Sequence, residues 1–95
     1  MEKGRVFHSS LFLIRVVSGM PDTRIAAVAP QKVSKTAVVR NRIRRKTYEA
    51  VRNIKPSIIQ GVHVAVFAKP SILNTKQVVI ASDIKDLFVK AGLLR

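Results

Sequence analysis

Three short runs in the first third of the chain have the hydrophobic pattern of β-strands. The clearest, residues 11–17, is a β-branched and aromatic run that ends where Gly19 and Pro21 supply turn chemistry. A shorter run at 5–8 precedes it, and another at 23–29 stops at a proline. We expect these three strands to pair as an antiparallel hairpin or meander.

After Ser34 the hydrophobic period changes to about 3.6 residues, which predicts an amphipathic helix. Ser34 or Thr36 can cap the start of this helix, and Pro56 ends it. Its polar side is left for solvent or a partner. The apolar stripe that would pack on a sheet consists of Thr36, Val39, Ile43, Thr47, Ala50 and Ile54.

The last third of the chain predicts one more strand and one more helix. Residues 61–68 are apolar at both odd and even positions, which is typical of a central strand covered on both faces. Asn74 or Thr75 can cap a final helix that ends before Gly92. The residues expected on the buried side of this helix are Val78, Ala81, Ile84, Leu87 and Phe88.

The predicted order is therefore β-β-β-α-β-α, an α+β fold built as a small two-layer sandwich, in which the first helix joins two strands. Because 95 residues suffice for one core only, we expect a single RNA-binding domain over residues 1–95. Charge alone indicates a nucleic acid, and a ribosomal, chromatin-like or RNA-processing partner would fit; the choice of RNA follows from the family resemblance of residues 32–45. With 18 Lys and Arg against five acids, the net charge is +13, which is typical of proteins that bind a phosphate backbone.

Composition also excludes several classes of protein. The chain has no cysteine, which excludes a disulfide scaffold and a thiolate zinc site, and two histidines alone cannot form a metal cluster. No run is long enough to span a membrane, and residues 1–7 do not resemble a signal peptide. We therefore expect a cytoplasmic protein with no membrane partner and no obligate protein partner.

The positive charge is concentrated at the start of the first predicted helix. Arg40-Asn41-Arg42 is followed directly by Ile43-Arg44-Arg45-Lys46, and residues 32–55 hold nine of the 18 cations but only one acid. Like charges at i,i+4 on a helix repel by a few tenths of a kcal/mol, so this crowding favours a polyanion as partner over a merely solvated basic face. Arginine can bridge two phosphate oxygens, and the Asn41 amide can bond a base edge or a 2′-hydroxyl. On the helical wheel Arg52 extends this surface opposite the apolar stripe.

Two aromatic residues could stack on an unpaired base. For Phe12, on the strand at 11–17, core packing is the preferred interpretation and stacking the alternative. Tyr48 points away from the apolar stripe of the helix, so a stacking platform and a simple surface residue both stay open. Among the five acids only Asp83 and Asp86 are close in sequence, and they suit pairing with Lys85, Lys90 or solvent better than metal binding. We predict no catalytic residue and no protein metal site, and we assign Mg²⁺ mainly to RNA phosphates.

The stretch from Lys32 to Arg45 closely resembles the signature of the bacterial ribonuclease P protein component. That signature has a Ser-Lys stretch, a small-residue turn, Ala-Val, then Arg-Asn-Arg and another basic pair. The strands at 11–17, 23–29 and 62–68, and the Lys90-Ala91-Gly92 segment, also have family counterparts. The resemblance thus covers most of the chain.

The resemblance implies a protein subunit of ribonuclease P, a ribonucleoprotein endoribonuclease that removes the 5′ leader from precursor tRNA and whose RNA performs the cleavage. Its partners would be the catalytic RNA and precursor tRNA. It also implies a left-handed β-α-β crossover through the basic helix, against the right-handed default. Carried over by position, the residues in contact with the catalytic RNA are Arg40, Asn41, Arg42, Arg44, Arg45 and Lys46, and those of the loop at the helix start are Lys32, Ser34 and Lys35.

Family members usually begin with a further helix that carries two Phe residues and forms one wall of the cleft for the leader. Residues 1–4 leave no room for it, so we expect leader binding to depart from the family pattern. Tyr48 stands where the family commonly has Arg, and Thr47 where it commonly has an apolar residue. The alternative function is a ribosomal or other structural RNA-binding protein without a processing role.

Overall fold

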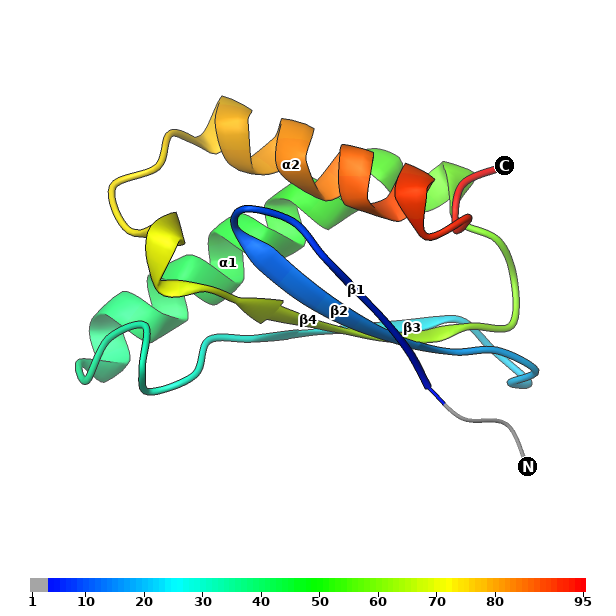
Figure 1. The fold of residues 1–95 in the computed structure, drawn as a ribbon, viewed down its shortest axis with the longest axis horizontal. Helices are drawn as coiled ribbons and strands as arrows, with labels where there is room; N and C mark the ends of the chain where they lie inside the picture. Colours follow the sequence, from blue (N-terminus) through cyan, green and yellow to red (C-terminus); the bar gives the residue numbers. More distant parts are fainter. Residues whose placement is uncertain (1–3) are drawn as a thin grey trace.

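A computed structural model describes residues 4–95 and contains four strands and two long helices (Figure 1). The elements are β1 (Arg5–His8), β2 (Phe12–Val17), β3 (Arg24–Val28), α1 (Ala37–Ile54), β4 (His63–Ala68) and α2 (Gln77–Lys90), with 3₁₀ turns at Lys55–Ser57 and Pro70–Ile72. The predicted order β-β-β-α-β-α is confirmed. Both helices lie against the same side of the sheet, so the sandwich has two layers (Figure 1).

The strands are arranged in the order β1-β2-β4-β3. Strand β2 pairs antiparallel with both β1 and β4, whereas β3 pairs parallel with β4. The predicted meander of the first three strands is therefore wrong: β1 and β2 form a hairpin, but β3 lies on the far side of β4. Helix α1 is the crossover that connects the parallel pair, as parallel neighbours require a long connection.

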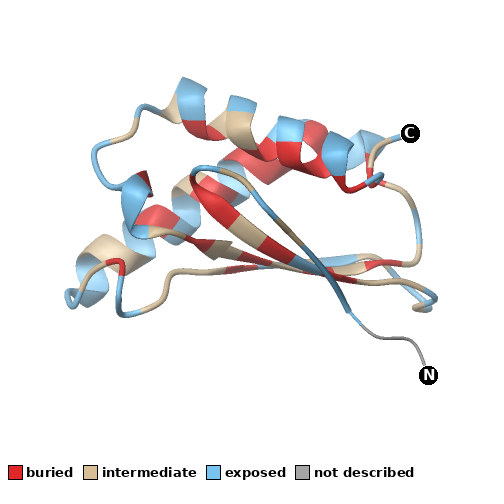
Figure 2. Ribbon diagram, in the orientation of Figure 1, coloured by how far each residue is buried: buried red, intermediate tan, exposed pale blue. Residues whose placement is uncertain are grey.

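The core lies between the sheet and the helices (Figure 2). On β4, Val64, Val66 and Ala68 are buried, whereas Ala65 and Phe67 on the opposite face are only half-buried. The prediction that this strand is covered on both faces is wrong, because α1 and α2 both pack on one face. Among residues 4–95 no helix or strand covers the other face. We call that other side the open sheet face.

Helix α1 buries the stripe that its period predicts, with two differences. Its buried residues are Ile43, Thr47, Ala50, Val51 and Ile54. Val39 is only half-buried and Thr36 is exposed, because the first turn of α1 extends beyond the sheet. Thr36 occupies the N-cap position but makes no side-chain cap bond. The Ser34 hydroxyl oxygen instead accepts a bond of 3.1 Å from the Thr36 backbone N–H.

Helix α2 begins at Gln77, later than either predicted cap, and Lys76 occupies the N-cap position. Val78 is 73% exposed, so its place on the predicted stripe is wrong. The buried residues are Ile80, Ile84, Leu87 and Phe88. At the start of α2 the buried stripe therefore begins at Ile80, two residues after Val78.

Two features complete the fold. Leu93 is fully buried, and its carbonyl accepts a 2.9 Å hydrogen bond from the N–H of Ile59. An isolated bridge between Ile58 and Leu94 continues this pairing, which closes the core below α2.

None of the helices described for residues 4–95 combines the length and the hydropathy that a membrane span needs.

Candidate nucleic-acid interface

The cations of α1 lie on both flanks of the helix. Arg42 and Lys46 line a hollow on the flank toward α2, together with Leu73 and Asn74 of the connecting loop. The opposite flank faces the outer edge of β3. There Asn41, Arg44, Arg45 and Tyr48 line a second hollow with Ala27. Buried Ile43 holds the turn that carries these side chains against the core, so the predicted Arg40–Lys46 cluster surrounds the exposed half of the helix.

This cluster has no internal counter-charge. Within residues 4–95 the ion pairs are Asp22 with Arg24, Asp22 with His63, and Glu49 with Arg52. None involves a cation between positions 40 and 46. A phosphate that approaches this part of α1 therefore has no ion-paired carboxylate among the described residues to displace.

Two cluster residues are oriented by hydrogen bonds. A guanidinium N–H of Arg44 donates to the Asn41 side-chain oxygen at 2.5 Å, so the two NH₂ donors of Asn41 stay available to a ligand. Arg40 is half-buried, and its guanidinium donates to the Ser34 carbonyl at 2.8 Å. Arg40 thus fixes the loop at the helix start to α1, a structural role that its place in the motif did not predict.

The predicted loop residues separate into two groups. Ser34 lines the hollow on the Arg42 and Lys46 flank, and Lys35 is exposed nearby in sequence. Lys32 instead lines a hollow on the open sheet face. Val33, which is buried and donates its N–H to the Pro30 carbonyl at 2.9 Å, separates them. The structure therefore does not bring Lys32 together with the arginine cluster.

Arg52 lies more than a turn after the cluster, and its guanidinium is 3.4 Å from the Glu49 carboxylate. Both side chains are more than half exposed, so the pair is a weak surface contact. Arg52 lines a third hollow, between β3 and the second half of α1. Its charge is partly offset by Glu49, in contrast to the cations at 40–46.

The two aromatic predictions have different outcomes. Phe12 has no exposed surface, so its preferred place in the core is confirmed and a stacking role is wrong. It lies on the face of β2 that the helices cover. Tyr48 is 44% exposed, and its hydroxyl oxygen accepts a 3.0 Å hydrogen bond from the Ala27 backbone N–H. Tyr48 is therefore attached to the sheet and still accessible.

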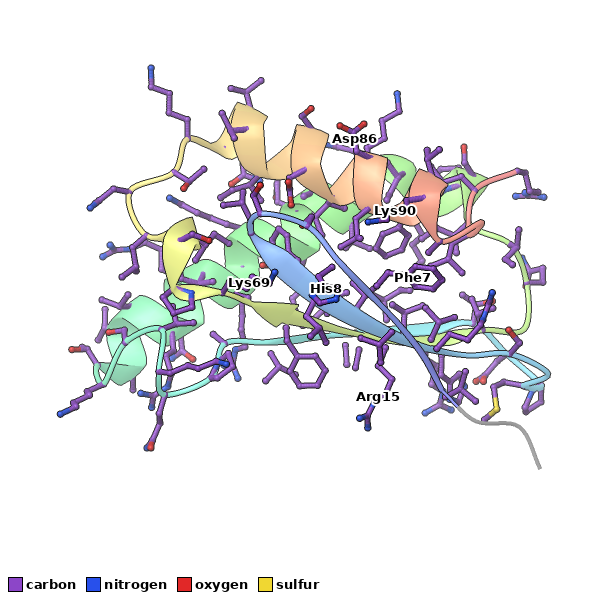
Figure 3. The ribbon with its side chains drawn as sticks, viewed as in Figure 1. Phe7, His8, Arg15, Lys69, Asp86 and Lys90 are labelled. Carbon is purple, nitrogen blue, oxygen red and sulfur yellow. The ribbon has the colours of Figure 1, made fainter. Side chains whose placement is uncertain are left out.

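The sequence-based prediction missed a basic hollow on the open sheet face. Leu13 and Phe67, which are paired across β2 and β4, form its apolar part. Arg15, Lys32 and Lys69 are its cations. Figure 3 shows Arg15 extending from the sheet on the side opposite the helices. The signal was present, because Leu13 and Arg15 have the opposite parity to the buried residues of β2.

A second charged group lies at the other end of the open sheet face. The Asp22 carboxylate accepts one hydrogen bond of 2.8 Å from the Arg24 guanidinium and lies 2.8 Å from a ring nitrogen of His63. The hydrogen bond with His63, followed by that with Arg24, holds the pKa of Asp22 below its ordinary value. Here the positive charge is compensated, unlike that of α1.

The four acids among residues 4–95 do not come together in one cluster. Asp83 accepts a hydrogen bond from the Ser9 hydroxyl and thereby links α2 to the β1–β2 turn, rather than pairing with a lysine. Within the part of the chain that the structure describes, no three His, Asp or Glu side chains are close enough together to hold a metal ion. The cations at 40–46 give this surface the chemical capacity to bind anions.

Comparison with known proteins gives the family of the chain. The sequence profile of the Ribonuclease P family matches residues 1–92 of the chain. The ribonuclease P protein component of Symbiobacterium thermophilum is 36% identical over 83 residues, which cover 87% of this chain and 70% of that protein. That of Microcystis aeruginosa is 31% identical over 96 residues, or 96% of this chain and 80% of that protein.

Solved structures share the fold. An RNase P protein of Staphylococcus aureus, a mutant with defective mRNA degradation activity, has a TM-score of 0.85 at 19% identity and covers 97% of this chain and 78% of that chain. The RNase P protein of Thermotoga maritima has a TM-score of 0.82 at 19% identity, and the match covers 93% of this chain and 84% of that chain. Since the profile matches nearly the whole sequence, this chain belongs to the ribonuclease P protein component family.

Proposed function

We propose that this chain is the protein subunit of ribonuclease P and that the surface of α1 binds the catalytic RNA of the enzyme. One observation carries the proposal: five cations between positions 40 and 46 lie on one ordered helix, and none has a carboxylate partner among residues 4–95. The family membership supports the same reading. The RNA supplies the negative charge that residues 40–46 of this helix lack.

The helix is suited to this role because it is rigid before RNA binds. Ile43, Thr47 and Ala50 are buried against the core, so the backbone of α1 pays little further ordering entropy on binding. Arginine forks on this fixed backbone neutralise phosphates that would otherwise repel one another. The protein thereby lowers the repulsion within the catalytic RNA and between that RNA and the substrate.

In this proposal the RNA subunit performs the endonucleolytic removal of the 5′ leader from precursor tRNA. Mg²⁺ is held mainly by RNA phosphates, and no side chain of the protein acts as acid, base or nucleophile. The complex works in the cytoplasm, in keeping with a chain that has no cysteine. The protein's contribution is electrostatic and positional.

The hollow on the open sheet face suits the leader of the precursor tRNA. Leu13 and Phe67 offer an apolar surface for bases, and Arg15, Lys32 and Lys69 surround it with positive charge. Basic grooves with an aromatic platform bind single strands without sequence preference. Substrate and catalytic RNA would then contact different sides of the protein.

The decisive experiment is reconstitution of the purified chain with a ribonuclease P RNA. At low Mg²⁺, where the RNA alone is slow, the chain should stimulate 5′ cleavage of a precursor tRNA. Replacement of Arg42 and Arg45 by Ala should abolish most of that stimulation. Replacement of Lys76 and Lys85 removes the same charge from the region of α2 and should leave it intact. RNA binding without any stimulation of cleavage would overturn the proposal and favour a structural RNA-binding protein.

A further inference from the structure

Tyr48 separates two hollows at the outer edge of β3. The hollow toward the start of α1 is lined by Ala27, Asn41, Arg44, Arg45 and Tyr48. The hollow toward the end of α1 is lined by Thr23, Ile25, Tyr48, Val51, Arg52, Lys55, Ile58 and Gln60. Tyr48 is the residue that the two share. Because the other helix residues of the two hollows lie before and after it, the side chain of Tyr48 borders open space on both sides.

The ring is held in this position from both ends. Its backbone belongs to the middle of α1, next to buried Thr47. Its hydroxyl accepts the 3.0 Å hydrogen bond from the N–H of Ala27 on β3. An aromatic ring fixed in this way loses little conformational freedom when a ligand stacks on it. The same bond occupies an outward N–H of the edge strand, which disfavours a peptide that would add as a further strand.

The surroundings match a nucleotide on each side. In the hollow toward the start of α1, the Asn41 amide can bond a base edge, while Arg44 and Arg45 can hold a phosphate. The hollow toward the end of α1 has an apolar floor of half-buried Ile25 and buried Val51 and Ile58. Arg52 and Lys55 are the cations at its rim.

The charge balance of the two hollows favours RNA over a neutral ligand. Their lining includes four cations, Arg44, Arg45, Arg52 and Lys55, and no acid. Glu49 is the nearest acid along the helix, and it lies 3.4 Å from Arg52, so the charge is strongest on the side of Arg44 and Arg45. A negatively charged backbone with planar bases satisfies both the cations and the exposed ring.

We propose that Tyr48 is a stacking platform for an unpaired segment of RNA that runs along the outer edge of β3. One base stacks on the ring, and the phosphates beside it bind Arg44 and Arg45. This site is separate from the hollow on the open sheet face. The proposal rests on the proposed function only in taking RNA as the ligand of α1, and it adds that the protein binds bases and not phosphates alone.

The test measures the affinity of three proteins, the wild type, Tyr48→Ala and Tyr48→Phe, for two RNAs. The first RNA is a short hairpin with an unpaired tail of four uridines, and the second has the same tail with abasic residues, so the number of phosphates is equal. For the wild type, removal of the bases should weaken binding by about tenfold, the order of magnitude of one stacked base. For Tyr48→Ala it should have little effect. Tyr48→Phe keeps the ring and should keep most of the preference for bases.

A spectroscopic measurement gives an independent readout. The chain contains a single Tyr and no Trp, so ¹³C-labelling of Tyr gives ring signals from Tyr48 alone. Stacking of a base should shift these signals upfield with the uridine tail and not with the abasic tail. Two results would overturn the proposal. One is an equal loss of affinity for the wild type and Tyr48→Ala when the bases are removed; the other is a set of ring signals that is the same with the uridine and the abasic tail.

Failure of this inference is distinguishable from failure of the proposed function. If the wild type binds both RNAs equally and with a steep salt dependence, α1 still binds phosphates and only the stacking platform is wrong. If the wild type binds neither hairpin and does not bind ribonuclease P RNA, the proposed function is wrong as well. Circular dichroism of Tyr48→Ala and Tyr48→Phe establishes that both variants are folded in these comparisons.

Discussion

Helices α1 and α2 pack side by side on one sheet face, yet they differ sharply in charge. Helix α1 has six cations and one acid, whereas α2 has two lysines and two aspartates. Both bury an apolar stripe of four or five residues in the same core. Packing on the sheet therefore requires no surplus of charge, since α2 does it with none. The excess on α1 lies on the side of the helix that does not pack on the sheet, among exposed and half-buried residues.

The two helices thus divide the work of the domain. In α2 the largest buried side chain, Phe88, has no exposed surface and adds to the core. In α1 the crowded cations lower the stability of the free protein through mutual repulsion, a cost that a bound polyanion offsets. Substitutions in α2 should therefore change folding, and substitutions on the exposed side of α1 should change binding.

The largest expected effect is on folding, from Phe88→Ala in α2. Removal of a fully buried Phe should lower the free energy of unfolding by about 3–5 kcal/mol, because apolar contacts are lost and a cavity remains. Urea unfolding followed by circular dichroism measures it. Val89→Ala, on the same helix but 58% exposed, is the control and should change stability by less than about 0.5 kcal/mol. Similar losses for the two variants would contradict the assignment of the buried side of α2.

The next effect is on RNA binding, from the double substitution of Arg42 and Arg45 by Ala in α1. Each lost phosphate contact should reduce the slope of log affinity against log salt by about 0.7 to 0.9, so the pair should reduce it by about 1.4 to 1.8. Filter binding to ribonuclease P RNA at several salt concentrations measures the slope. The Lys76 and Lys85 double variant removes equal charge and should leave the slope unchanged; an equal decrease would mean that net charge, and not the α1 surface, governs binding.

The same Arg42 and Arg45 variant should be slightly more stable than the wild type when no RNA is present. Arg42 lies at i,i+4 to Lys46 and at i,i+3 to Arg45, and each like-charge pair costs a few tenths of a kcal/mol. The gain should be clear at low ionic strength and vanish near 1 M salt, where the Debye length is about 3 Å. Urea unfolding at the two salt concentrations checks this. A loss of stability at low salt would show that these arginines support the fold.

The smallest effect concerns Asp22, which is hydrogen-bonded to Arg24 and His63, whereas the α1 cations at 40–46 have no carboxylate partner among residues 4–95. Hydrogen bonds from His63 and Arg24 hold its pKa below the ordinary 3.8. The stabilisation is therefore present above that value and is lost as the pH falls through the lower pKa of the folded state. Asp22→Asn should be slightly less stable than the wild type at neutral pH and should lose less stability on acidification below pH 4. If the acid unfolding curves of Asp22→Asn and the wild type run parallel, the hydrogen bonds to Asp22 contribute nothing to stability.

Local pattern predicted the elements well and their partners less well. The period of 3.6 residues located α1, and the run at 11–17 located β2, because each signal is contained in neighbouring residues. The pairing of β3 with β4 joins strands separated by a whole helix, and no local period contains it. The one-sided burial of β4 was likewise unpredictable from its own residues, since it depends on where both helices lie.

In the candidate site, too, the features contained in neighbouring residues were predicted and the long-range contacts were not. The motif from Arg40 to Lys46 was visible in sequence, because helical spacing places its cations on the outside of α1. The bond between Tyr48 and Ala27, and that between Arg40 and Ser34, depend on three-dimensional positions of loops and strand edges. Lys32 was grouped with the cluster because it is near in sequence, yet it lines the hollow on the open sheet face.

The pairing of Ile59 with Leu93 has a consequence for the order of events during synthesis. The ribosome releases α1 well before Leu93, whose buried side chain and carbonyl close the core. Until then the apolar stripe of α1 has no complete partner, a state in which nascent chains are prone to aggregate. The arginines on its other side repel further copies of the same segment. A surface suited to RNA in the finished protein can thus also keep the unfinished chain from aggregating.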